Sequence, residues 1–100
     1  MAGETSDRFA QAVAHRALAE ALGGDADRQP AEQAMGEAIR LWKEIEWKPE
    51  LARSYVCYAR LLQQWDQQDT ARAYLTEASS MFQEMSMDWD LAQAEQVLGS

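Results

Sequence analysis

The chain has 100 residues, of which 47% are hydrophobic, and its formal net charge is −8. This length favours one small domain, and the acidic surplus disfavours nucleic acid and anionic membranes, which require a basic surface. No apolar run approaches the roughly 20 residues of a membrane span, and residues 1–10 carry no signal-peptide apolar stretch. We therefore expect a cytoplasmic protein that binds neither nucleic acid nor membrane.

Good helix formers dominate the sequence and β-branched residues are scarce, which predicts an all-α fold. The apolar spacing predicts five helices, at about 7–22, 30–45, 49–64, 69–85 and from 88 to the C-terminus. Gly23 and Gly24 stop the first helix. Pro30 and Pro49 suit the first turns of the second and third, and Asp69 is expected to cap the fourth.

The sequence repeats itself with a period of 40 residues. The segment LWKEI at 41–45 returns as MFQEM at 81–85, and small and bulky apolar residues recur at matching positions elsewhere. Within a single domain spanning 1–100, this predicts one helical hairpin at about 9–48, a second at about 49–88 and a partial third at 89–100. Repeats on this scale are typical of stacked helical hairpins.

The two copies resemble tetratricopeptide repeats. The positions that carry the resemblance are Leu18-Ala19, Leu22, Ala31, Met35 and Ala38 in the first copy, and Tyr58-Ala59, Leu62, Ala71, Leu75 and Ala78 in the second. The period exceeds the family's usual length of about 34 residues. It is similar to the long-repeat variety in the C-terminal arms of bacterial transcription regulators, ATPases and nucleotide cyclases. The resemblance implies hairpins stacked as a short right-handed solenoid that binds other proteins.

The resemblance also implies a binding groove along the outward face of the first helix of each hairpin. Its expected residues are Val13, Arg16, Glu20, Arg53, Val56, Arg60, Gln63, Gln93 and Gln96. Three of the chain's nine basic residues would share this surface, which favours an acidic or carboxylate-bearing peptide as partner. The alternative is a solvated helix face with ordinary ion pairs, such as Glu50 with Arg53.

The sequence ends with half a repeat, so an apolar surface near the C-terminus would lack a following hairpin to cover it. The residues expected on this surface are Met81, Phe82, Met85, Met87, Trp89, Leu91 and Leu98. They predict a homo-oligomer, most simply a two-fold dimer; the alternative is a fragment of a longer array. Trp42 is expected in the core and Trp47 between hairpins, whereas Trp65 and Trp89 are candidate contact residues.

The residues of catalytic and metal chemistry are not grouped in the sequence. The single histidine, His15, aligns with Tyr55 in the repeat and lies far from Cys57, so it is interpreted as a packing residue. Zinc requires three or four nitrogen and sulfur ligands, and the acidic pair Asp25 and Asp27 lacks the ligand ladder of a calcium loop. We therefore expect no enzyme activity, no cofactor and no metal.

These observations favour a non-catalytic scaffold for protein–protein interaction, which binds a protein or peptide and self-associates. The alternative is a sensor or regulatory arm of a larger bacterial transcription regulator, ATPase or nucleotide cyclase. A flanking effector domain in the complete gene would favour the second hypothesis. The identity of the partner is not encoded in any motif of the sequence.

Overall fold

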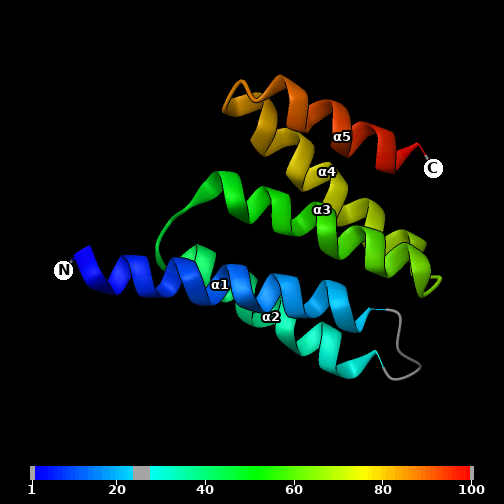
Figure 1. The fold of residues 1–100 in the computed structure, drawn as a ribbon. Helices are drawn as coiled ribbons and strands as arrows, with labels where there is room; N and C mark the ends of the chain where they lie inside the picture. Colours follow the sequence, from blue (N-terminus) through cyan, green and yellow to red (C-terminus); the bar gives the residue numbers. More distant parts are fainter. Residues whose placement is uncertain (1, 24–27, 100) are drawn as a thin grey trace. The chain divides into compact units, whose positions relative to one another are not determined.

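The computed structural model describes residues 2–23 and 28–99, and Figure 1 shows their course. The helices in this part of the chain are α1 (Ala2–Leu22), α2 (Gln29–Glu44), α3 (Lys48–Gln64), α4 (Gln68–Glu84) and α5 (Asp88–Leu98). No strand occurs among these residues. The prediction of an all-α fold with five helices is therefore confirmed. The predicted turn residues Gly24, Asp25 and Asp27 lie outside the described residues.

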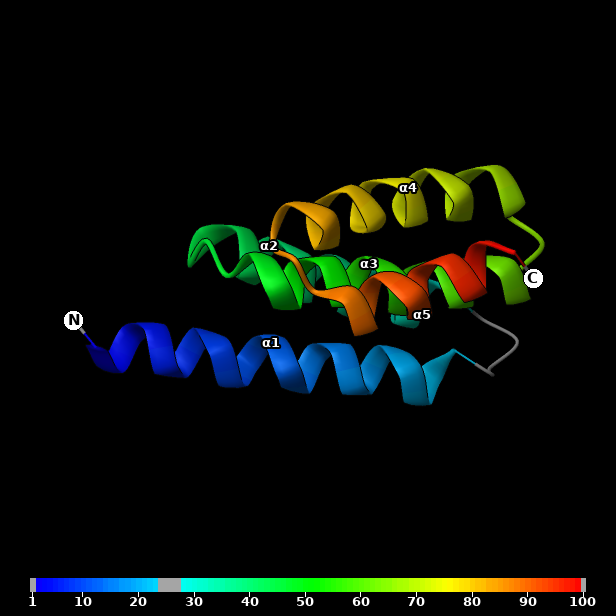
Figure 2. The same cartoon turned by 90° about the horizontal axis from the view of Figure 1, so that it is seen from above.

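The chain divides into two compact units, residues 1–47 and 48–100. In the first unit α1 and α2 form an antiparallel hairpin, and in the second α3 and α4 form another (Figure 1). Helix α5 packs against both helices of the second hairpin (Figure 2). The boundary between the units falls one residue before the predicted boundary between repeats. Stacking of the units as a right-handed solenoid stays a prediction.

From the end of α2 onward, the helices follow a regular spacing of 20 residues. Helices α3, α4 and α5 begin at Lys48, Gln68 and Asp88, and helices α2, α3 and α4 end at Glu44, Gln64 and Glu84. A turn of three residues separates each pair of consecutive helices in this stretch. The 40-residue repeat of the sequence therefore contains two helices of matched length in its second copy.

The three short turns share one backbone geometry. The middle residue of each turn has a positive φ, namely 55° at Glu46, 61° at Asp66 and 57° at Ser86. In each turn, the following N–H donates a hydrogen bond to the carbonyl five residues back, as from Met87 to Phe82 at 2.9 Å. This is the Schellman arrangement, which satisfies the last carbonyls of a helix and usually has glycine at the positive-φ position.

Two helix starts differ from the prediction. Helix α1 begins at Ala2, more than one turn before the expected start near residue 7, because apolar periodicity marks only the part of a helix that buries a face. Helix α4 begins at Gln68, and its N-cap residue, Gln67, makes no side-chain capping hydrogen bond. The prediction that Asp69 caps α4 is wrong; Asp69 lies in the first turn, where its charge suits the helix dipole.

The repeated apolar positions form the core. The most deeply buried are Ala31, Met35, Ala38 and Trp42 in α2, and Ala71, Leu75, Ala78 and Phe82 in α4, each at most 1% exposed. Burial of Trp42 confirms its prediction as a core residue. Phe82 was expected on the self-association surface, and this is wrong, because the same helix position that buries Trp42 in the first copy buries Phe82 in the second.

Trp47 contacts its own hairpin. The ring of Phe9 meets Trp42 edge to face at a centroid distance of 4.9 Å and meets Trp47 in the same way at 5.3 Å. Because Trp47 directly follows the positive-φ residue of the turn after α2, this contact ties the end of α2 to α1. The observed role of Trp47 is therefore within the first unit, and a role between hairpins stays a prediction.

Replacing Ser86 with glycine should stabilise the protein. A side chain in the left-handed region costs about 1–2 kcal/mol, and the added backbone freedom of glycine in the unfolded chain removes about 0.5–1 kcal/mol of the gain. We expect the free energy of unfolding, measured by urea titration, to rise by about 0.5–1 kcal/mol. Ser80→Gly, on the exposed face inside α4, is the control and should lower it; a loss in both variants would contradict the turn geometry.

Candidate interaction surfaces

Arg53 joins α3 to α5 within the second unit. Its Nε donates a hydrogen bond to Oδ1 of Asp90 at 3.0 Å, and its Nη2 donates to Oδ2 at 3.2 Å. Its Nη1 donates to Glu50 on the preceding turn of α3. The two carboxylate side chains are only 11% and 12% exposed. The hydrogen bond to Asp90, followed by that to Glu50, raises the pKa of Arg53 above its usual range, so the guanidinium stays charged.

A second polar contact reinforces the attachment of α5. The side-chain Nε2 of Gln63, near the end of α3, donates a hydrogen bond to the backbone carbonyl of Val97 at 3.0 Å. Val97 lies near the end of α5 and is 8% exposed. Arg53 and Gln63 therefore fix opposite ends of α5 on the same helix.

These contacts correct part of the predicted groove. Arg53 and Gln63 are bonded to α5, and Val56 is only 7% exposed, so none of the three lies on an open surface. The physical reason is that α5 covers the face of α3 that the resemblance implied would bind a peptide. The sequence suggested Glu50 as an ordinary partner of Arg53, and that ion pair is present, but it did not reveal Asp90.

The other predicted groove residues are more accessible. Arg60, Gln96 and Glu20 are exposed, and Gln93 is partly exposed. In the first unit Val13 is 37% exposed. The guanidinium of Arg16 lies over the ring of Trp42 at 5.7 Å from its centroid, which is a cation–π arrangement. A continuous groove that combines residues of both units stays a prediction.

The predicted self-association surface is accessible in part. Trp89 is 71% exposed and Leu98 39% exposed, the first at the start of α5 and the second at its end. The remaining members, apart from Phe82, are partly exposed: Met81, Met85, Met87 and Leu91. Trp65 is also partly exposed, and it makes an interaction with another residue. Trp89 is thus the large apolar side chain that this region presents most fully to solvent.

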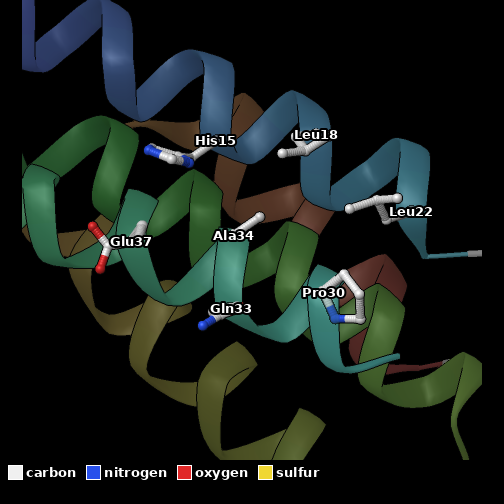
Figure 3. Close-up of a pocket in the computed structure, with 7 residues that line it drawn as sticks. All are labelled: His15, Leu18, Leu22, Pro30, Gln33, Ala34 and Glu37. Atoms are coloured by element: carbon white, nitrogen blue, oxygen red, sulfur yellow. The ribbon is translucent and has the colours of Figure 1, made fainter. Parts of the chain in front are cut away.

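The first unit carries a hollow between α1 and α2 that was not predicted. Its volume is about 460 Å³, and Figure 3 shows the lining residues His15, Leu18, Leu22, Pro30, Gln33, Ala34 and Glu37. The side chains of α1 lie across from those of α2, with Leu22 and Pro30 at one end and His15 and Glu37 at the other (Figure 3). Leu18 is 48% exposed beside the hollow. His15 therefore lines a surface hollow and is not a core residue.

Metal-binding and membrane-spanning features were also sought in residues 2–23 and 28–99. Within those ranges, no three or more histidine, cysteine, aspartate or glutamate side chains are grouped to hold a metal ion. None of the helices there combines the length and the apolar character needed to cross a membrane. The fold and its surfaces define the class as an all-α, helical-repeat-like protein. No protein-family model, curated protein or solved structure matches the chain.

Replacing Arg53 with alanine should loosen α5. It leaves the nearly buried carboxylates of Asp90 and Glu50 without their shared cation, and a hydrogen bond to a charged group contributes about 1.5–3 kcal/mol. Because the guanidinium is 43% exposed and solvent screens it, we expect the free energy of unfolding to fall by about 1–2 kcal/mol. Hydrogen exchange should accelerate first in α5.

Arg40→Ala is the matched control for this experiment. Arg40 pairs with Glu37 and Glu44, both at 2.7 Å, on the exposed surface of α2. Solvent screens such pairs, so the control should destabilise the protein less than Arg53→Ala. Equal losses in the two variants, or unchanged exchange in α5, would show that Arg53 does not attach α5.

Proposed function

We propose that this chain is a non-catalytic protein-interaction and assembly module. The observation that carries the proposal is a set of large apolar side chains exposed on an acidic protein. They are Val13, Leu18, Trp47, Trp89 and Leu98, which range from 37% to 71% exposed. Exposed aromatic and aliphatic anchors are characteristic of binding surfaces. The all-α, helical-repeat-like fold supports the same function, because helical hairpins present whole helix faces to a partner.

We infer that self-association is one part of this function. Trp89 and Leu98 lie at the two ends of α5, and covering them would remove apolar area from water, which favours association by about 25 cal/mol per Å². Partly exposed methionines before α5 extend the available apolar area, and their flexible side chains adapt to a partner surface.

Self-association is tested by measuring molar mass in solution over a concentration series. We expect the weight-average mass of the wild-type chain to rise with concentration above that of the 11.3 kDa monomer, as sedimentation equilibrium would record. Mass action requires this dependence for any reversible oligomer. A mass that stays at the monomer value throughout the series would contradict the assembly part of the proposed function.

A protein or peptide partner is the other part, in a cytoplasmic setting and with a tetratricopeptide-type groove as the binding mode. An acidic partner is supported by Arg60, which is exposed and makes no ion pair with the described residues. Arg16 is partly exposed over Trp42 and adds a second cation to the first unit. Carboxylates bind arginine through paired, charge-assisted hydrogen bonds.

Reversing the charge of Arg60 should weaken partner binding. We expect Arg60→Glu to reduce the amount of partner that the chain captures from the source organism's extract by at least about tenfold, the effect of losing about 1.4 kcal/mol. Arg72→Glu changes the net charge equally on the exposed face of α4 and should leave capture unchanged. Quantitative mass spectrometry of the captured proteins measures both. Equal capture by both variants and the wild type would contradict a role for Arg60.

A further inference from the structure

The two hairpins differ where the hollow lies. In the second hairpin, the ring of Tyr74 on α4 lies 5.3 Å from that of Tyr55 and 5.0 Å from that of Tyr58, both on α3. The residues 40 positions earlier are Ala34, His15 and Leu18. All three of these line the hollow of the first hairpin. The hollow therefore lies where the second hairpin holds a cluster of aromatic rings.

The hollow suits an apolar ring in size and lining. Its volume of about 460 Å³ is within the range of about 300–1,000 Å³ that is usual for ligand pockets. Leu18, Leu22 and Pro30 supply apolar walls, and the small side chain of Ala34 leaves the space between them open (Figure 3). Covering the half-exposed Leu18 with a ring would remove further apolar surface from water.

The charges at the two ends of the hollow are unequal. At the Pro30 end lies the N-terminus of α2, whose N-cap residue, Arg28, makes no side-chain capping hydrogen bond. The first N–H groups of the helix and the nearby guanidinium make that end electropositive. At the other end Glu37 is neutralised by Arg40, whose hydrogen bond and charge lower the pKa of the carboxyl. The hollow therefore fits an aromatic residue that carries a carboxylate beside it.

The chain itself carries such a residue pair. Trp89, at 71%, is the most exposed large hydrophobic residue in the described part of the chain. It follows Asp88, which is also exposed, in the first turn of α5. The next residue, Asp90, is bonded to Arg53, so the start of α5 is held in place. The pair is thus presented on a fixed helix end, which lowers the entropy cost of binding.

We propose that the hollow between α1 and α2 binds the Trp89 side chain of a second copy of this chain. Asp88 of that copy then faces the electropositive N-terminus of α2. The proposal rests on the self-association in the proposed function and gives it a specific contact. The two surfaces involved are different, so each copy offers one hollow and one tryptophan. Mutual insertion closes a dimer, and single insertions build an open chain.

Two variants remove the two halves of this contact. Ala34→Tyr introduces the residue that the second hairpin has at this position and fills the hollow, and Trp89→Ser removes the ring. We expect each to weaken self-association at least about thirtyfold, the effect of an interface residue contributing about 2 kcal/mol. Trp89→Phe retains a ring and should lose less. Ala10→Tyr, on an exposed part of α1 outside the hollow, should associate like the wild type.

Mixing the two variants provides the decisive measurement. Ala34→Tyr still presents Trp89, and Trp89→Ser still has an open hollow, so the mixture should form a one-to-one complex that neither variant forms alone. Sedimentation velocity of each variant and of the mixture records this outcome. Thermal unfolding should show that Ala34→Tyr folds as stably as the wild type, because the corresponding backbone position in α4 already carries a tyrosine.

The outcomes separate this contact from the broader function. If the wild type associates and Ala34→Tyr associates equally well, the hollow is not the binding site, although self-association stands. If both variants lose association but their mixture stays monomeric, the pairing of Trp89 with the hollow is wrong. A wild type that is monomeric at every concentration overturns the second copy as occupant; partner capture in the Arg60 experiment would then still support the interaction function.

Discussion

The close approach of two helices at small residues is the constraint on which each hairpin depends. Ala19 of α1 and Ala31 of α2 are fully buried, and their counterparts Ala59 and Ala71 are at most 1% exposed. A methyl group at such a position lets helix backbones come near enough for larger side chains to fill the grooves on either side. Each hairpin therefore packs around alanines, and the identity of the flanking large residues decides whether its surface is filled or hollow.

The turns convert this packing into a regular arrangement. Three turns of the same Schellman geometry, each with a non-glycine residue at positive φ, hold the helices from α2 to α5 at a constant spacing. A fixed helix length fixes which residues face the neighbouring helix, because one residue more would rotate the next position by about 100°. The turns thereby keep Phe82 in the core and leave Trp89, seven residues later, at the exposed start of α5.

The attachment of α5 changes the functional interpretation of the second unit. The arginine expected to bind a partner peptide instead binds Asp90, and the glutamine expected beside it binds the backbone of α5. An internal helix thus occupies the surface of α3 that the resemblance assigned to a ligand. What remains available is the exposed ring of Trp89 and, in the first unit, the hollow beside Leu18. Both are apolar features suited to contact with another protein, which is why the proposed function places assembly beside partner binding.

The sequence by itself determined the helical class, the number of helices and the repeated core positions such as Met35 and Leu75. These follow from apolar spacing and turn residues, which are local in the chain and have the period of a helix. Only the tertiary structure decided that Arg53 binds Asp90, 37 residues away, and that a hollow lies beside Ala34. Both depend on side chains from different helices meeting in space, and no local pattern specifies which of several carboxylates an arginine reaches. A missing ring leaves a hollow only when the opposite helix does not fill the space, and that is a property of the packed hairpin.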